Sequence, residues 1–380
     1  MAQRKTHAKS RLGCLTCKRR HVKCNEERPK CDKCLKLGLH CKWATRPDES
    51  KSPATSASSP ATSQHNKISS PNLGLADLRL LHHWLRRTVP ASFVDGDAVQ
   101  PWLDELVELG FEQPYLLHAM LAVAAVHKAT SSNNPGDLCL QASAHIDVAL
   151  RSLQTYIKEP DAESYVPIFT TASLMVLYKL GVAQVEPPVD PIADTYDWIR
   201  LLRGVATVVH QFRDQLQHAA SGTLLQAAPM SETTGEIPGV THLRSLVTEL
   251  HVSDVAESCL FAVDDLHDTM LSLEQDSTRP LHLSRRLIFT WPIRQRPAFV
   301  ELLSSKDPTA LIILAHYAAV FHACRKQWPM QNWATWILDA VKTAIDPALH
   351  SWLSWPAQVL LQEPADEWLW PKANDAALPS

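Results

Sequence analysis

Glycine is scarce in this chain, which has 11 glycines among its 380 residues. None of them belongs to a G-x-G-x-x-G, G-x-x-x-x-G-K-[ST] or G-x-S-x-G pattern, and no H-E-x-x-H sequence is present. Those patterns supply the phosphate loops, nucleophile elbows and zinc-protease helices of common enzymes. The sequence therefore offers no catalytic motif, and we expect a protein that is not an enzyme.

Long apolar runs and a leader segment are also lacking. The most apolar stretch, residues 310–321, contains His316 and is shorter than the roughly 20 residues that a bilayer requires. The first twelve residues are basic and have no apolar core of the kind that a signal peptide needs. We expect no membrane span and a reducing compartment, where cysteines bind metal more readily than they form disulfides.

Cysteine is abundant in one place. Six of the nine cysteines lie between residues 14 and 41, in two C-x2-C-x6-C units related by a shift of 17 positions. A C-x-x-C pair in a tight turn can direct both thiolates at one metal ion. The array therefore predicts a zinc site built from Cys14, Cys17, Cys24, Cys31, Cys34 and Cys41.

The number of ligands indicates how many ions are bound. Two tetrahedral zinc ions need about eight ligand positions, which six cysteines supply if two of them bridge both ions. His21 and His40 are alternative ligands, but the 17-residue shift superimposes the cysteines and not these histidines. A disulfide framework is the other alternative. We prefer a thiolate-bridged cluster of two zinc ions.

The two cysteine units differ in charge. The first contains the basic segment Lys18, Arg19, Arg20, His21, Lys23, whereas the second contains Leu35, Leu37 and Leu39 and is predicted to pack. A basic helix held by zinc can enter the major groove of DNA and donate to guanine edges and phosphates. We therefore expect double-stranded DNA as the partner. A solvated basic face without a partner is the alternative reading.

Charge is unevenly distributed along the chain. Residues 1–46 contain 14 Lys or Arg against 3 Asp or Glu, and the whole chain has a formal charge of −3. The remainder is therefore strongly acidic, so only the N-terminal part suits a polyanion. Residues 47–73 are rich in Ser, Pro, Ala and Thr, which is typical of a flexible linker. They contain no apolar heptad, so we expect residues 1–75 to be monomeric.

Helical periodicity dominates from residue 75 onward. Leu75, Leu78, Leu81, His82 and Leu85 recur at spacings of three and four, which predicts the apolar face of a helix. Similar patterns predict an all-α region of about ten helices, with a surface loop over residues 221–239. Further helical ranges are 103–110, 114–125, 138–157, 169–182, 198–216, 242–273, 297–303, 309–327 and 333–345.

Scattered histidines and tryptophans occur within this helical region. For His82, His83, His118, His127, His316 and His322 we expect hydrogen bonds to neighbours rather than a metal site. The tryptophans crowded after residue 327 are expected to pack in the core, and a minority are candidates to line an apolar pocket.

Residues 11–43 resemble the binuclear zinc cluster of fungal transcription factors. The likeness is carried by R-x-G-C-L-T-C-K-R-R-H-V-K-C, from Arg11 to Cys24, and by R-P-K-C-D-K-C, from Arg28 to Cys34. The resemblance implies that Cys14 and Cys31 bridge both ions, while Cys17 and Cys24 complete one site and Cys34 and Cys41 the other. The usual base-reading Lys or Arg is His21 here, so Arg20 or Lys18 would read more of the site.

The helical region resembles the regulatory domain of fungal sterol uptake control proteins and their relatives. The matching stretches are L-G-L-A-D-L-R-L-L-H-H-W at residues 73–84, G-F-E-Q-P-Y-L-L-H-A-M-L-A-V-A-A-V-H at 110–127, W-I-R-L-L-R-G-V at 198–205 and L-A-H-Y-A-A-V-F-H at 314–322. In the sterol regulators this domain binds a sterol and controls nuclear entry, whereas many relatives activate a local metabolic gene cluster. The resemblance implies either role.

Together these observations predict five segments. They are a basic arm (1–13), a binuclear zinc cluster DNA-binding domain (14–43), a flexible linker (44–73), an all-α regulatory domain (74–361) and an acidic, Trp-containing tail (362–380). The expected function is zinc-dependent regulation of RNA polymerase II genes in a fungal nucleus, with a secondary-metabolite gene cluster as target. The alternative target is sterol or lipid genes. Transcription machinery and an apolar ligand of the helical domain are further candidate partners.

Two other functions are alternatives from the sequence. One is that the helical region is an enzyme domain on a nucleic-acid tether, but no nucleophile, phosphate or metal motif follows residue 42. It can also be read as a ligand-binding switch that is held in the cytosol. Lipid copurifying with the helical region would favour the switch.

Overall fold

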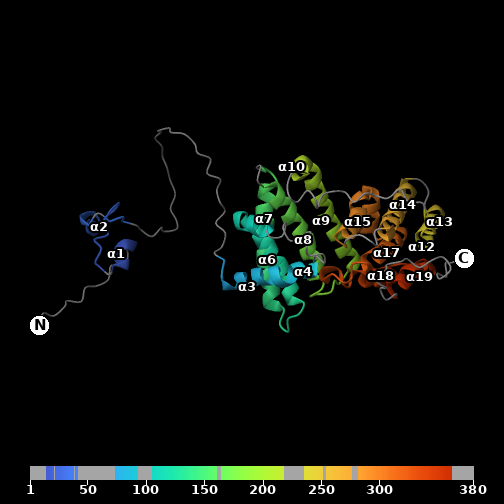
Figure 1. Ribbon diagram of the computed structural model, residues 1–380, viewed down its shortest axis with the longest axis horizontal. Helices are drawn as coiled ribbons and strands as arrows, with labels where there is room; N and C mark the ends of the chain where they lie inside the picture. Colours follow the sequence, from blue (N-terminus) through green and yellow to red (C-terminus); the bar gives the residue numbers. More distant parts are fainter. Residues whose placement is uncertain are drawn as a thin grey trace. The chain divides into compact units, whose positions relative to one another are not determined.

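The computed structural model describes residues 14–20, 22–37, 39–41, 73–92, 105–160, 164–217, 235–250, 254–275 and 281–361. The chain divides into two compact units, Met1–Ile68 and Ser69–Ser380. All regular secondary structure of the described residues is helical (Figure 1). This confirms the predicted fold class of a small cysteine-rich domain followed by a large all-α domain. The predicted linker up to residue 72 and the tail from residue 362 lie outside the described residues.

The N-terminal unit has two short helices, α1 (Leu15–Arg19) and α2 (Asp32–Lys36), each beginning directly after a cysteine. Its buried core consists of cysteines. Leu35, Leu37 and Leu39 are 64%, 53% and 36% exposed, so the prediction that the second cysteine unit packs through its leucines is wrong for this unit. Five residues per helix bury too little apolar surface to hold the fold, so the sulfur atoms must do so.

The helical unit begins with three consecutive segments, α3 (Leu75–His83), η1 (Trp84–Thr88) and α4 (Val89–Ser92). The predicted apolar face of this stretch is not the buried one. Leu75, Leu78 and Leu85 are 67%, 57% and 41% exposed, while Leu80 and Trp84 are each 1% exposed. Leu80 and Trp84 are one helical turn apart and pack on the next helices, so the interior uses the opposite side of α3.

Three long helices form the first part of the helical unit. Thirteen of the 16 residues of α6 are buried, because α6 lies against both α7 and α8. The predicted start at Pro114 is confirmed, since proline at the first helical position costs no hydrogen bond. Residues 105–112 form a helix before it. The three helices are α6 (Pro114–Ala129), α7 (Gly136–Tyr156) and α8 (Tyr165–Val182).

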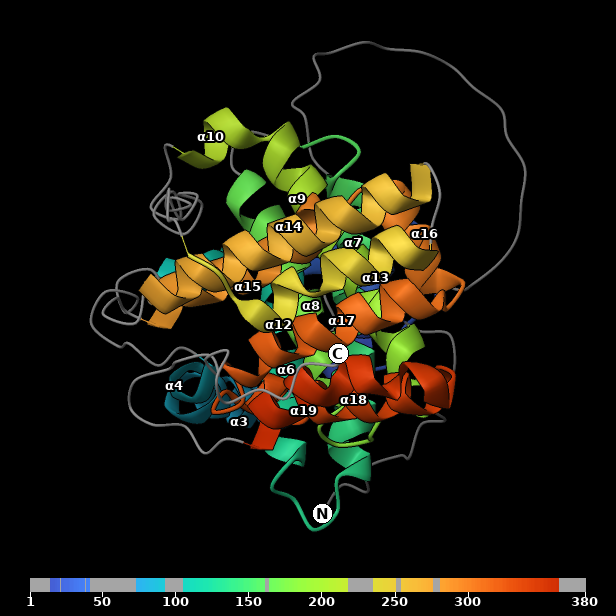
Figure 2. The same ribbon diagram turned by 90° about the vertical axis from the view of Figure 1, so that its right-hand side faces the viewer.

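A second set of helices surrounds α17, of whose 15 residues 14 are buried. α17 contacts α13, α14, α16, α18 and α19, and Figure 2 shows it between α13 and α14 on one side and α18 and α19 on the other. The remaining elements of the unit are α9 (Pro191–Gln211), α10 (Arg213–Gln217), α12 (Pro238–Thr241), α13 (Leu243–Leu250), α14 (Asp254–Gln275), α15 (Leu281–Arg294), α16 (Pro297–Ser304), α17 (Pro308–His322), η3 (Trp328–Met330), α18 (Trp333–Ala344), η4 (Pro347–Leu353) and α19 (Ser354–Leu361).

Aromatic side chains connect these helices in the interior. Trp333 is fully buried, and its ring meets the Trp198 ring edge-on at 6.3 Å. Its indole N–H donates to the Leu180 carbonyl at 3.1 Å, which ties α18 to the end of α8. Trp355 is 2% exposed and its ring stacks on the His316 ring at 5.5 Å. The expectation that most of the late tryptophans pack in the core therefore holds for these residues.

Among the described helices, α8 alone is long and apolar enough to cross a membrane by length and composition. It packs against α6 on one side and α9 on another, and its residues contribute to three apolar clusters of the interior. The core helix of a folded domain passes the same test. Its packing identifies α8 as such a core helix.

Two helices differ from the prediction. α15 was not predicted, and α9 begins at Pro191 rather than at the predicted residue 198. Asp190 caps the N-terminus of α9 and Pro191 is its first residue. The Asp190 side chain accepts from the Ala193 N–H at 3.1 Å. Such a cap followed by proline is a recognised helix start. α15 contains Pro292 and lies between the predicted helical ranges 242–273 and 297–303. Its end is held by Arg203, whose Nη1 donates to the carbonyls of Pro292, Ile293 and Gln295 at 3.3, 3.1 and 2.8 Å.

The predicted hydrogen bonding of interior histidines is confirmed for three of them. His118 Nδ1 lies 2.7 Å from His145 Nδ1, and His145 Nε2 lies 3.1 Å from an Asp77 oxygen. His127 Nδ1 lies 2.9 Å from the Thr88 hydroxyl, and His316 Nδ1 donates to the Ile312 carbonyl at 2.9 Å. His82, in contrast, is exposed. Among the described residues, every group arranged to hold a metal ion consists of cysteines.

Candidate metal centre and nucleic-acid interface

The 17-residue repeat of the sequence is also a repeat of the backbone. The Cys14 N–H donates to Cys24 Sγ at 3.4 Å, and the Cys31 N–H donates to Cys41 Sγ at 3.3 Å. Two backbone hydrogen bonds of the first half recur in the second. The Lys18 N–H donates to the Cys14 carbonyl at 3.0 Å, and the Leu35 N–H donates to the Cys31 carbonyl at 2.9 Å. Likewise, the Val22 N–H donates to the Cys17 carbonyl at 3.2 Å, and the Leu39 N–H donates to the Cys34 carbonyl at 2.9 Å. The two halves are therefore equivalent in fold although they differ in charge.

Each half places a C-x-x-C pair on the first turn of its helix. Cys14 is the N-cap residue of α1, and its sulfur accepts from the Cys17 N–H at 3.4 Å. Cys31 holds the same position before α2, which contains Cys34. Residues three apart in a helix lie on one face, so both sulfurs of each pair point to the same side.

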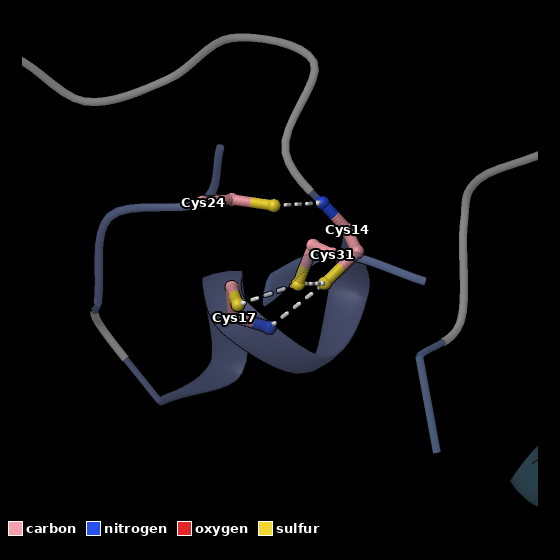
Figure 3. Close-up of side chains that lie close together, drawn as sticks. All are labelled: Cys14, Cys17, Cys24 and Cys31. Atoms are coloured by element: carbon pink, nitrogen blue, oxygen red, sulfur yellow. Dashed lines mark hydrogen bonds between the residues drawn. The ribbon is translucent and has the colours of Figure 1, made fainter. Parts of the chain in front are cut away.

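The sulfur atoms form two groups of four that share two members. One group is Cys14, Cys17, Cys24 and Cys31, drawn in Figure 3, and the other is Cys14, Cys31, Cys34 and Cys41. Within each group all sulfurs lie within 4.8 Å of one another. Cys14 and Cys31 belong to both groups, and both are 0% exposed.

The sulfur separations fit tetrahedral zinc and not a disulfide. Cys14 Sγ lies 3.7 Å from Cys31 Sγ, and Cys17 Sγ lies 3.6 Å from Cys31 Sγ. A zinc–sulfur bond of about 2.3 Å at a tetrahedral angle separates two ligands by about 3.8 Å. A disulfide would bring two sulfurs to about 2.05 Å. All six thiols are free of disulfide bonds, so the donor set fits two zinc ions and the disulfide alternative fails.

Burial and crowding act on the acidity of these thiols. Burial, followed by the neighbouring sulfurs, raises the pKa of Cys17 well above its usual value. The same two causes raise the pKa of Cys34 to about 12. At Cys31 burial also opposes ionisation, but the Cys34 N–H and neighbouring sulfurs lower the pKa to about 6. Six thiolates packed this closely require cations between them, which a pair of zinc ions supplies.

Two polar contacts join the halves and were not anticipated. The Thr16 hydroxyl on α1 donates to the His40 carbonyl at 2.7 Å, and the Asp32 N–H at the start of α2 donates to Asn25 Oδ1 at 3.1 Å. Thr16 and Asn25 flank the cysteines in sequence. His40 thus contributes its carbonyl to this contact.

The basic side chains of the first half are available to a partner. Lys18 on α1, Arg20 in the turn after it and Lys23 are all exposed. Arg19 closes α1, whereas His21 lies outside the described residues. In the equivalent positions of the second half, Leu35, Leu37 and His40 replace Lys18, Arg20 and Lys23. The second half keeps the exposed Lys33 and Lys36 of α2, so the two halves differ at these three equivalent positions and not in the presence of basic side chains as such.

Comparison with known protein families now identifies both units. Residues 12–51 match the Fungal Zn(2)-Cys(6) binuclear cluster domain. Residues 79–236 match the Fungal specific transcription factor domain. The chain is a fungal zinc cluster transcription factor. The predicted family and the absence of an enzymatic role are thereby confirmed, and zinc cluster transcription factors bind DNA through a domain that holds two zinc ions.

This zinc cluster transcription factor is similar to several curated proteins, over very different shares of its length. The Zn(2)-C6 fungal-type transcription factor afumD of Aspergillus fumigatus is 25% identical over 84% of this chain and 87% of its own length. Sterol uptake control protein 2 of Saccharomyces cerevisiae is 29% identical, over 36% of this chain and 15% of that protein. The aspercryptin biosynthesis cluster-specific transcription regulator atnN of Emericella nidulans is 33% identical, over 26% of this chain and 14% of that protein.

Proposed function

We propose that Cys14, Cys17, Cys24, Cys31, Cys34 and Cys41 are the ligands of the two zinc ions. The two sulfur groups of four, with Cys14 and Cys31 in common, support this assignment and carry the proposal. Cys17 and Cys24 would complete one site, and Cys34 and Cys41 the other. The ions would supply the folding energy of a unit whose core contains no large apolar side chain among its described residues.

Substitution of individual cysteines tests the ligand assignment. Because Cys14 belongs to both groups and Cys41 to one, Cys14→Ala should abolish binding of both ions, and Cys41→Ala should abolish binding of one. Cys139→Ala is the matched control, since Cys139 lies in α7 of the other unit. Zinc per chain is measured by elemental analysis after dialysis. Full occupancy of both sites in the Cys14 variant would contradict the assignment.

DNA contact is assigned to the first half, through Lys18, Arg19, Arg20, His21 and Lys23. The exposure of Lys18, Arg20 and Lys23 beside the cysteine cluster supports this reading, with α1 entering the major groove. Arg20→Ala should cost about 1–3 kcal/mol of binding free energy and relax sequence preference if Arg20 reads a base. An equal loss on every DNA sequence would mean that Arg20 contacts phosphate instead.

A matched pair of lysines separates the two halves. Lys18→Ala should weaken DNA binding and lower the salt dependence of the affinity by about one unit of slope, because one phosphate or base contact is lost. Lys36→Ala removes the same charge from α2 in the leucine-bearing half and should have a smaller effect. The measurement is fluorescence anisotropy across a salt series. Equal effects of the two variants would refute the assignment of DNA contact to the first half.

The biological role inferred is control of RNA polymerase II genes in the nucleus, with a secondary-metabolite gene cluster as the target. Its support is the partial similarity to a cluster-specific regulator. Genome-wide occupancy of the tagged chain in its host, with Cys31→Ala as the control, tests this role. Peaks confined to one compact biosynthetic cluster are expected. The alternative, peaks at dispersed sterol or lipid genes, is supported by the partial similarity to a sterol uptake control protein.

An apolar ligand of the helical domain is a second candidate function. A groove of about 570 Å³ lies between α7, α8 and α9, and its lining includes Leu150, Leu201 and Gly204 together with the charged Lys179, Asp197 and Arg200. A Cβ atom added at Gly204 would meet nothing within 4 Å, so there is open space next to this residue. Gly204→Phe should fill this groove and abolish binding of a fluorescent apolar probe, whereas Gly136→Ala, at the start of α7, should not.

The proposed domain boundaries follow the same assignments: a basic arm at 1–13, the zinc cluster at 14–43, a linker at 44–73, the regulatory domain at 74–361 and an acidic, Trp-containing tail at 362–380. Contact of that tail with transcription machinery is part of the proposal. Its acidic and aromatic composition, Q-E-P-A-D-E-W-L-W at 362–370, supports such a role. Deleting residues 362–380 should then reduce reporter activation measured relative to DNA occupancy.

A further inference from the structure

The outer side of α3 and the beginning of η1 carry an apolar stripe. Leu75, Leu78, His82 and Leu85 recur at spacings of three, four and three, so they share one helix face, opposite the buried Leu80. The three leucines are 67%, 57% and 41% exposed. A row of leucines turned to solvent on the first helix of a well-packed domain is typical of a contact surface.

Arginines border this stripe. Arg79 directly follows Leu78 in the sequence and Arg86 directly follows Leu85. Both arginines are exposed, as is Arg87. Among the described ion pairs none involves these three arginines. Asp77, the one carboxylate of α3, is already engaged, with one oxygen 3.1 Å from His145 Nε2 and the other accepting from the Gly74 N–H at 2.7 Å. The leucine–arginine face (Leu75, Leu78, Leu85, Arg79, Arg86) is therefore positively charged.

The charge of this face limits what can cover it. Two leucine–arginine faces pairing with each other would bring arginines from both copies together, which opposes association. A complementary segment instead needs carboxylates and large apolar side chains. The chain outside its N-terminal part has an acidic net charge, so the protein itself can supply such a segment.

One segment of the chain has this composition. Residues 362–370 contain three acidic side chains, Glu363, Asp366 and Glu367, followed by Trp368, Leu369 and Trp370. We propose that this segment of one chain docks on the leucine–arginine face of a second copy. The carboxylates would pair with Arg79 and Arg86, and the tryptophans would cover the leucines.

A second copy is the favoured source because of reach. Six residues separate Leu361, the end of α19, from Trp368, and they span at most about 25 Å when fully extended. Figure 1 shows α3 and α19 toward opposite ends of the helical unit. If each of two copies places its segment on the other, the assembly closes as a two-fold dimer. That dimer would carry two zinc clusters, although residues 42–72 contain no apolar heptad.

The test is a charge exchange in the full-length, zinc-loaded chain without DNA. Sedimentation velocity at low salt should show a dimer for the natural chain. Arg79→Glu with Arg86→Glu should weaken dimerisation by about tenfold or more, and Glu363→Lys with Asp366→Lys and Glu367→Lys should do the same. In an equimolar mixture of the two variants the mixed dimer has opposite charges at both of its interfaces and should form, and a chain that carries all five substitutions should regain the dimer.

Matched controls separate this contact from other effects. Arg151→Glu changes an exposed arginine of α7 by the same charge, and Leu140→Ala shortens a leucine that is 72% exposed, so neither should alter the dimer. Leu78→Ala should weaken it, with helical content unchanged by circular dichroism.

Three results would overturn the proposal. They are a natural chain that remains monomeric, a dimer that tolerates both charge reversals, and an exchange that fails to restore association. Docking of the segment within its own chain would appear as the first of these. Because the assay contains no DNA, failure of the proposed DNA contacts would leave its outcome unchanged.

Discussion

The two units of this protein have cores of different chemistry. In the N-terminal unit the buried side chains are mainly cysteines, and leucines such as Leu35 point to solvent. In the helical unit two nearly fully buried helices, α6 and α17, are surrounded by apolar and aromatic side chains. Leucines such as Leu116 and Leu314 supply the core of the helical unit, whereas the described leucines of the N-terminal unit are exposed and supply no core.

This difference shows which interaction stabilises each unit. A unit of about 30 residues cannot bury enough apolar surface to offset the entropy lost on folding, whereas roughly 300 residues can. Metal–thiolate bonds replace the apolar core in the first case. The small unit is consequently free to use its exterior for contact.

Removing the metal should produce the largest effect and should affect one unit alone. Chelation withdraws about 10–16 kcal/mol of apparent zinc-binding free energy from the N-terminal unit. In hydrogen exchange on the full chain, amides of residues 14–41 should lose protection while those of α6 and α17 keep it. Excess zinc should reverse the change. Retained protection at residues 14–41 would show that the small unit has a core of its own.

Truncating a buried aromatic side chain should produce the converse result. Trp333→Ala should lower the free energy of unfolding of the helical unit by about 3–5 kcal/mol, because Trp333 is fully buried against Trp198 and Trp336. The zinc content should not change. Denaturant unfolding followed by circular dichroism measures the loss. Leu140→Ala, at an exposed position of α7, serves as the control, and an equal loss there would contradict the argument.

Acid should destabilise the helical unit through its buried histidines. Burial lowers the pKa of His118, His127 and His316 to about 4, so each favours the folded state in its neutral form. Their contribution is complete above the unfolded value near 6.5 and is lost as pH falls towards 4. Asp265 opposes this trend, because burial raises its pKa to about 6 and the folded state then favours its protonated form.

The histidine contribution can be isolated by substitution. His316→Gln should flatten the dependence of the unfolding free energy on pH between 6.5 and 4 by about 1–3 kcal/mol. The control is His82→Gln, since His82 is exposed and should leave the profile unchanged. The measurement is denaturant unfolding of the full chain at several pH values. An unchanged profile in the His316 variant would rule out this cause.

Loss of the Arg203 cap should have the smallest of these effects. Arg203→Ala removes the donor shared by three carbonyls at the end of α15 and should cost about 1–3 kcal/mol. Arg203→Lys should recover part of this stability, and the exposed Arg151→Ala should cost little. Thermal unfolding with zinc present measures the difference. No change in the Arg203 variant would mean that water replaces the guanidinium.

Sequence reasoning was most successful where the signal is local. The helix start at Pro114 and the late tryptophans packing in the core both follow from short-range rules. It failed at α3, where leucines spaced at three and four marked a face that turned out to be exposed. It also missed α15, which contains Pro292 and whose last carbonyls accept from Arg203, 89 to 92 residues away.

The six cysteines and their 17-residue shift determined the small unit, since ligand number and reach are properties of adjacent residues. The tertiary structure decided which side of α3 is buried, which bond accompanies each interior histidine, and how the carbonyls at the end of α15 are satisfied. Periodicity specifies that a helix has two faces, but the neighbours that claim one of them come from distant parts of the chain. Only packing can therefore choose between Leu78 outside and Leu80 inside.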